Sequence, residues 1–109
     1  MTEAYMHVPD LAALVPSVPA DSILSRTYYD GDDSRAILFA FAAGQELSEH
    51  TAARPAILHF LSGQARLTLG GDAQRAGPGT WVHMPAHMAH SIFAETEVVM
   101  LLVLVGPGA

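Results

Sequence analysis

The 109-residue chain contains no cysteine and only five basic residues, all of them arginine. Without cysteine it has neither disulfides nor thiolate metal ligands, which excludes a disulfide-stapled secreted domain and a zinc knuckle. Because eleven acidic residues give a formal net charge of −6, the chain lacks a basic surface for phosphates, and no nucleic-acid partner is expected.

Long hydrophobic runs are also missing. The longest, Val98 to Val105, falls well short of the ~20 residues of a membrane-spanning helix, so we expect a buried strand and no membrane partner. The first residues resemble neither a secretory signal nor a transit peptide, and a cytoplasmic location is therefore expected. Half of the residues are hydrophobic and 15% are charged, which is typical of one compact folded domain.

The turn chemistry predicts an all-β fold. From Ser22 onward, short β-rich segments alternate with glycine, proline and aspartate at roughly ten-residue spacing, as in sandwiches and barrels. Residues 23–29 and 35–42 flank a turn and predict a hairpin, and residues 56–61 and 65–69 around Gly63 predict a second. Further strands are expected at residues 81–84, 91–94 and 97–105.

The first part of the chain differs from the rest in its proline content. Residues 1–21 hold three of the seven prolines, too closely spaced for a long helix or a central strand. Asp10 is placed to cap one helical turn over Leu11 to Val15. We therefore expect an N-terminal arm over residues 1–21, followed by a barrel over residues 22–109.

Histidine is the enriched residue. The chain has six, and five lie within 41 residues: His50, His59, His83, His87 and His90. Neutral imidazole is a ligand for Zn, Cu, Fe and Ni, and a metal site in a barrel needs ligands on different strands that all point inward. The enrichment therefore suggests a divalent transition metal site, although spacing alone does not establish one.

Two segments resemble the sequence motifs of the cupin family. Residues 44–63 match G-x5-H-x-H-x3-E-x6-G at Gly44, His50 and Gly63. Residues 79–94 match G-x5-P-x-G-x2-H-x3-N at Gly79, Pro85 and His90. The resemblance covers about residues 22–105 and implies a double-stranded antiparallel jelly-roll barrel.

The departures from these motifs affect the expected site. Ala52 and Ala56 stand where the family places a second histidine and a glutamate, His87 stands for a glycine, and Ala94 for an asparagine. Of the usual four ligands, His50 and His90 are left. His87, in the turn before His90, is our candidate for a replacement third ligand or an acid/base group.

Strand alternation separates the remaining candidates. If position 56 faces the interior, as the glutamate of the family does, Leu58, Phe60, Met84 and Ile92 give the barrel an apolar lining suited to a small, partly hydrophobic ligand. His59 and His83 then face outward on two strands expected to pair, where they form an interface or surface pair, or a second histidine site.

The resemblance implies two kinds of function. A bound Fe, Mn, Ni, Cu or Zn ion would support oxygen activation, as in a dioxygenase, or Lewis-acid isomerisation or cyclisation of a small-molecule ligand. Alternatively, His50 and His90 are hydrogen-bonded polar groups without a metal, or the barrel is a non-catalytic sensor or store. An outer face with Ile57, His59, Leu61 and Trp81 further predicts a homodimer.

Overall fold

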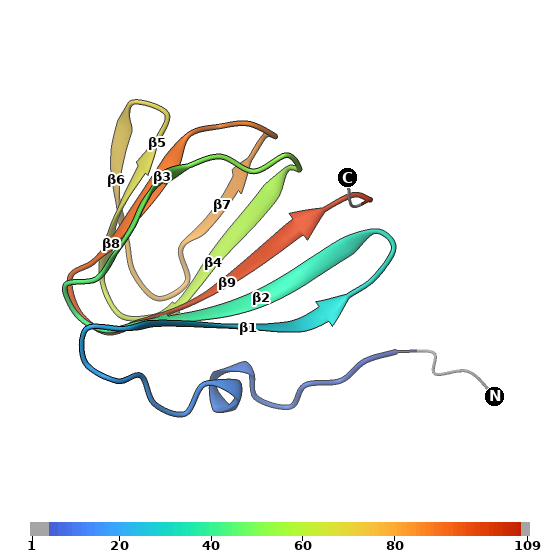
Figure 1. Cartoon of the computed structure of the whole chain (residues 1–109), viewed down its shortest axis with the longest axis horizontal. Coiled ribbons are helices and arrows are strands. Elements are labelled where there is room, and N and C mark those ends of the chain that lie inside the picture. The colour runs from blue at the N-terminus through green and yellow to red at the C-terminus, as the bar shows by residue number, and fades with distance from the viewer. Residues whose placement is uncertain (1–4, 108–109) are drawn as a thin grey trace.

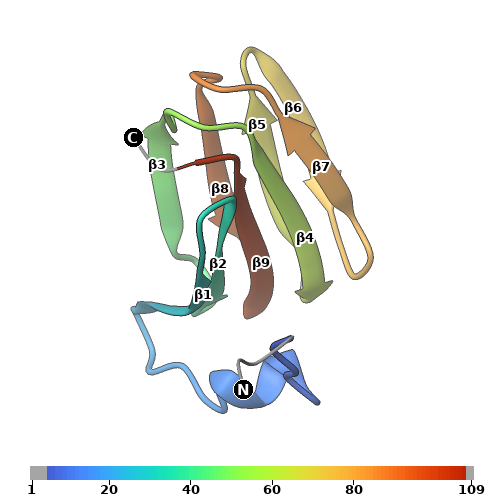
Figure 2. The same ribbon diagram turned by 90° about the vertical axis from the view of Figure 1, so that its right-hand side faces the viewer.

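The computed structural model describes residues 5–107, which form two antiparallel sheets stacked around one apolar interior (Figures 1 and 2). The strands of this region are β1 (Ile23–Asp30), β2 (Ser34–Phe41), β3 (Glu46–His50), β4 (Ala56–Ser62), β5 (Ala65–Leu69), β6 (Asp72–Ala76), β7 (Trp81–Met84), β8 (His90–Ala94) and β9 (Val98–Val105). The larger sheet has the order β1-β2-β9-β4-β7 and the smaller sheet the order β3-β8-β5-β6. This arrangement confirms the predicted all-β jelly-roll barrel.

The core lies between the two sheets and follows the alternation expected from the sequence. Ala56, Leu58 and Phe60 of β4 are buried, whereas the residues between them are only half-buried. The smaller sheet contributes Leu67 and Ile92 to the same cluster. One face of each sheet therefore closes the barrel, and the other faces outward.

One predicted hairpin is confirmed and the other is wrong. β1 pairs with β2, as expected. β4 and β5, by contrast, lie in different sheets: β4 pairs with β7 and β9, and β5 pairs with β6 and β8. Gly63 has a φ of +87°, and a Cβ there would lie 1.9 Å from the Glu97 carbonyl oxygen. The turn is thus a tight corner that passes the chain from one sheet to the other.

β6 was not expected from the sequence. Its first four residues are exposed and only Ala76 is buried, so it shows no apolar alternation. It forms because Gly70 and Gly71 make a two-residue turn that places Leu69 opposite Asp72. Gly70 has the positive φ, 59°, that favours glycine at the first position of such a hairpin turn.

The described part of the arm packs on the outer face of the larger sheet, away from the smaller sheet (Figures 1 and 2). The 3-10 helix η1 (Leu11–Leu14) begins after Asp10, whose side chain accepts a hydrogen bond from the Ala12 N–H, confirming the predicted cap. The Arg26 side chain donates to the Leu14 carbonyl at 3.3 Å. Leu38, opposite Arg26 on β2, is fully buried although it points away from the barrel interior.

Several loops meet at one end of the barrel, which we call the mouth. Residues 51–55 connect β3 to β4, and residues 85–89 connect β7 to β8, so both loops cross between the sheets (Figure 1). The His87 N–H donates to the Ala52 carbonyl at 2.7 Å, which ties the two loops together. Within residues 5–107, no helix has the length and apolar character needed to cross a membrane.

Candidate functional site

The structure brings His50 and His90 together at the mouth. They are directly opposite each other on the paired strands β3 and β8, and their ring centroids are 4.1 Å apart with the rings inclined by 59°. His90 is buried, with 5% of its surface exposed, whereas His50 is exposed. The pair thus joins the interior of the barrel to solvent.

A shift in strand register places His50 on the inner face. Leu47 is opposite Ile92, so a regular ladder would set Glu49 opposite His90. The register shifts between Leu47 and His50, and the extra residue turns His50 inward. Glu49 is exposed, as expected for a solvated side chain.

Both rings are oriented by the backbone in the same way. His50 Nδ1 lies 2.8 Å from the Ser48 carbonyl oxygen, and His90 Nδ1 lies 2.9 Å from the Met88 carbonyl oxygen. Because a carbonyl oxygen only accepts hydrogen bonds, each Nδ1 is the donor in the neutral ring. Each Nε2 then carries the lone pair, and this is the arrangement found in metal-binding histidines.

The environment of His90 also favours the neutral ring, whose Nε2 lone pair is free. Burial lowers the pKa of His90 from its ordinary value of 6.5; the hydrogen bond to Met88 opposes this shift, and the nearby His50 adds to the lowering. The neutral ring is therefore favoured at neutral pH, and only a neutral ring offers a lone pair.

His87 lies in the mouth but outside this pair. It is exposed, has a φ of +69°, and contributes its backbone N–H to the bond with Ala52. Among residues 5–107, no group of three or more His, Asp or Glu side chains is arranged to hold a metal ion. A role for His87 as third ligand or acid/base group stays a prediction.

The four predicted lining residues all face the interior. Leu58, Phe60, Met84 and Ile92 belong to the hydrophobic core and are at most 1% exposed. They form a packed floor rather than the wall of an open space. The partly buried Leu69, opposite His90, packs against this floor beside the pair.

His59 and His83 lie on the outer face of the larger sheet, as alternation predicts. β4 and β7 do pair, but His59 is opposite Trp81, and His83 is opposite Ile57. The two histidines are thus diagonal neighbours and not a directly opposed pair. His59 is half-buried and His83 exposed.

Sequence reasoning missed Arg35. It occupies the mouth end of β2 opposite Leu104, which packs against the core, so its side chain is on the inner face. Its Nη2 donates to Thr27 Oγ1 at 3.4 Å, and its buried Nε has no hydrogen-bond partner among the described residues. The one signal in the sequence was strand alternation, which places position 35 on the inner face of its strand.

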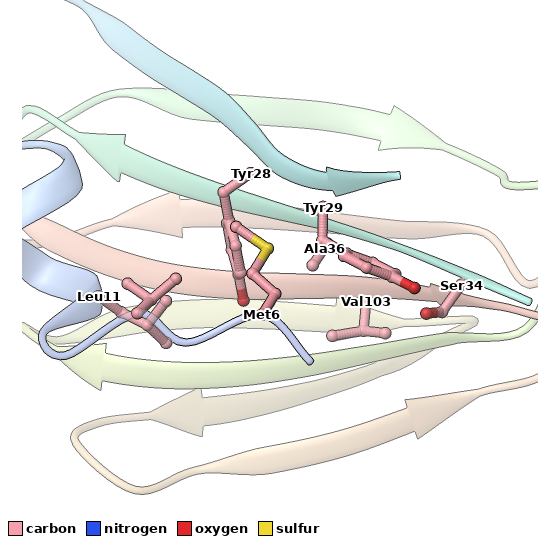
Figure 3. A pocket seen from close by; sticks show the side chains of 8 residues that line it. Met6, Leu11, Tyr28, Tyr29, Ser34, Ala36 and Val103 are labelled. Carbon is pink, nitrogen blue, oxygen red and sulfur yellow. The ribbon is translucent and has the colours of Figure 1, made fainter. Parts of the chain in front are cut away.

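The cavities of the described region include one beneath the arm, and neither His50 nor His90 lines it (Figure 3). It has a volume of about 480 Å³ and lies between Met6, Val8 and Leu11 of the arm and the outer face of β1, β2 and β9. Tyr28 and Tyr29 both line it (Figure 3) because the register of β1 shifts between Thr27 and Tyr29. Partial burial raises the pKa of Tyr28 above 10.0.

Two sheets closed around an apolar interior, with a pair of adjacent imidazoles at one end, define a jelly-roll barrel protein. Comparison with known families agrees: the model of the cupin domain matches residues 37–106. The chain belongs to the cupin family. A search of curated proteins finds no significant match.

Solved structures share this fold. A conserved protein of unknown function from Streptococcus pyogenes is 33% identical over 100% of this chain and 93% of that chain, with a TM-score of 0.83. A cupin superfamily protein from Desulfitobacterium hafniense DCB-2 is 26% identical over 87% of this chain and 86% of that chain, with a TM-score of 0.81. The salicylate 1,2-dioxygenase of Pseudoaminobacter salicylatoxidans is 18% identical over 83% of this chain and 26% of that chain, with a TM-score of 0.73. This last likeness shows the fold alone.

Proposed function

We propose that the protein binds a divalent transition metal ion through Nε2 of His50 and His90, together with a small, partly apolar ligand. The observation that supports this most strongly is the shared orientation of the two rings. Each Nδ1 is occupied by a backbone carbonyl two residues earlier, which leaves both Nε2 lone pairs available on neighbouring strands.

The donor set fits a nitrogen-preferring metal with open positions. Two neutral imidazoles suit Fe, Ni, Cu or Zn, whereas Mn is a candidate only through the family resemblance, and the remaining positions are left to water or to the ligand. When bound, such an ion supplies Lewis-acid polarisation or oxygen activation to a ligand that it coordinates. Dioxygenase and isomerase or cyclase chemistry are the reaction classes we propose.

The other residues of the mouth would serve the ligand. His50 is exposed, so a ligand can reach the pair from solvent, while His90 and the floor of the barrel exclude water from beneath. The neutral form of His90, favoured by burial, keeps its Nε2 free of a proton. We propose His87, whose backbone N–H ties the two loops beside the pair together, as an acid/base group or, after a loop movement, as a third ligand.

Calorimetric titration with Co²⁺ tests this proposal. Wild-type protein is expected to bind one ion per chain, and His50→Ala and His90→Ala are each expected to weaken binding by at least about a hundredfold. A double variant of the outer-face histidines, His59→Ala/His83→Ala, is the matched control and should bind as wild type. Equal binding by the His50, His90 and control variants would contradict the proposal. His87→Ala tests a third ligand in the same assay.

A non-catalytic sensor or store is the second candidate. It is favoured by the alanines at positions 52 and 56 and by the absence of a three-donor cluster among the described residues. The two functions differ in what happens to the ligand: an enzyme with metal and oxygen consumes it, whereas a sensor releases it unchanged. Oxygen-electrode measurement and mass spectrometry of recovered ligand separate them.

We also propose that the protein acts as a cytoplasmic homodimer. The arm covers the β1 and β2 part of the larger sheet, and the part around Trp81, which is 58% exposed, is left open. Ile57, His59 and Leu61 lie on the same outer face. A second copy seated there would cover this apolar surface. Light scattering should give twice the 11.6 kDa chain mass, and a monomer would refute the proposal.

A further inference from the structure

The cavity beneath the arm has no charged side chain among the described residues that line it. Five of its eight lining residues are apolar, and the other three, Tyr28, Tyr29 and Ser34, carry hydroxyl groups. A charged ligand would lose hydration in this cavity without meeting an opposite charge, whereas a neutral ligand avoids that cost. The lining therefore favours a neutral ligand.

Two consecutive tyrosines reach the cavity because β1 contains a bulge. The register shifts between Thr27 and Tyr29, so Tyr28 is one residue more than the ladder with β2 needs. In a regular strand, Tyr28 and Tyr29 would face opposite sides of the sheet. The bulge turns both toward the arm, and their rings extend in different directions from β1, which separates the two hydroxyls (Figure 3).

Gly31 makes room for the ring of Tyr29. A Cβ at position 31 would lie 2.7 Å from Tyr29 Cζ and closer still to the hydroxyl oxygen. Gly31 does not have a positive φ, so its backbone conformation does not itself require glycine. A side chain at position 31 would displace the ring. The bulge and the turn after β1 together therefore set the position of this phenol group.

The three hydroxyls of the cavity keep their hydrogen-bonding capacity. The side-chain hydrogen bonds found within residues 5–107 involve none of them. Partial burial raises the pKa of Tyr28, so its phenol group stays neutral and both donates and accepts hydrogen bonds. A polar group of a ligand can therefore be paired here, while its apolar part contacts Leu11 and Val103.

Part of the cavity wall is apolar surface that is open to solvent. Met6 is 53% exposed and Tyr29 is 40% exposed, although both line the cavity. A ring between them would cover this surface, and thioether and phenol groups both make favourable contacts with aromatic rings. The volume of about 480 Å³ is within the range typical of small-molecule sites.

We propose that this cavity binds a small neutral phenol, with its ring between the arm and β1 and its hydroxyl paired with a hydroxyl of the wall. The thioether and the two tyrosine rings favour an aromatic ring, the unpaired hydroxyls favour a polar group that both donates and accepts, and the uncharged lining favours neutrality. The lining shares no residue with the His50–His90 pair, so this site does not depend on the proposed metal site.

4-Ethylphenol and its charged analogue 4-ethylbenzoate are the probes. Calorimetry at pH 7.5 is expected to show one saturable site per chain for 4-ethylphenol, and binding of 4-ethylbenzoate that is weaker by roughly tenfold or more. Tyr28→Phe/Tyr29→Phe keeps both rings but removes their hydroxyls, and it should weaken 4-ethylphenol binding by about fivefold or more. Tyr5→Phe, at an exposed side chain outside the lining, is the matched control and should bind as wild type. Unchanged binding by the double variant, or equal binding of the two probes, would overturn the inference.

A second readout locates the ligand in wild-type protein. The markers are the ε-methyl resonances of Met6 in the arm and Met88 in the loop of the mouth, identified by their loss in Met6→Leu and Met88→Leu. With 4-ethylphenol, the Met6 resonance should shift and saturate while the Met88 resonance stays unchanged. A shift of Met88 in place of Met6 would mean that the phenol binds at the mouth. No shift of either would mean that the cavity is closed or is covered by a second copy, and each of these results would overturn the inference.

The same titration in His50→Ala/His90→Ala separates this site from the proposed metal site. The double variant should bind 4-ethylphenol as wild type does, with or without Co²⁺. Loss of phenol binding together with the two imidazoles would overturn this inference, whereas loss of Co²⁺ binding alone leaves it intact.

Discussion

Leu47 and His50 lie three residues apart on β3, yet both turn toward the interior of the barrel. Leu47 is opposite Ile92, and His50 is opposite His90, with a register shift between the two pairs. In a regular strand, residues three apart lie on opposite faces. The bulge therefore allows one short strand to contribute both a core side chain and the imidazole that meets His90.

The buried His90 makes stability depend on pH. Its pKa is lowered in the folded protein, so below the unfolded value of 6.5 the unfolded chain binds more protons than the folded one. This part of the stability is complete above pH 6.5 and is lost as the pH falls toward the lower, folded-state pKa. Urea unfolding of metal-free protein at pH 7.5 and pH 5 should show a smaller loss in His90→Gln than in wild type. His83→Gln, at an exposed site, is the control; equal losses in all three proteins would contradict this account.

The corner at Gly63 is expected to be intolerant of any side chain. A Cβ there would meet the Glu97 carbonyl oxygen at 1.9 Å, and the φ of +87° is itself unfavourable. Gly63→Ala should lower the free energy of unfolding by about 3 kcal/mol or more. Gly44→Ala is the matched control: it has a φ of +84° and open space around it, so only the backbone cost of about 1–2 kcal/mol applies. Equal losses would show that the contact with Glu97 is unimportant.

The arm is predicted to stabilise the barrel by covering Leu38. The Leu38 side chain is 0% exposed although it lies on the outer face. The residue opposite it on β1 is Arg26, which donates a hydrogen bond to the Leu14 carbonyl of the arm. Leu38→Ala should lower the free energy of unfolding by about 2–5 kcal/mol. Leu24→Ala, at a side chain that is 37% exposed, should cost less than about 1 kcal/mol. A small effect at Leu38 in urea unfolding would mean that the arm does not pack there in solution.

Much of the fold could be predicted from local chemistry. Alternation placed Leu58 inside and His59 outside, and Asp10 marked the start of η1, as observed. The sheet assignment of the strands around Gly63 could not be predicted, because the sequence of a glycine turn does not determine whether the strands on its two sides pair with each other. β6 has an almost wholly exposed sequence and becomes a strand only through its pairing with β5.

The site could be predicted less completely. Motif spacing identified His50 and His90, and the structure brings them together. The bulge that turns His50 inward depends on the pairing of β3 with β8, which the sequence does not reveal. Arg35 carries no motif, and its buried, unpartnered Nε and weak contact to Thr27 are visible only once the side chains are placed.

The most direct test of the central claim is elemental analysis of untagged protein purified without added metal or chelator. The account predicts close to one transition metal ion per chain in wild type and in His59→Ala/His83→Ala, and almost none in His50→Ala or His90→Ala. Wild-type protein that carries no metal, even after reconstitution with each candidate ion, would contradict the claim that the His50–His90 pair is a metal centre.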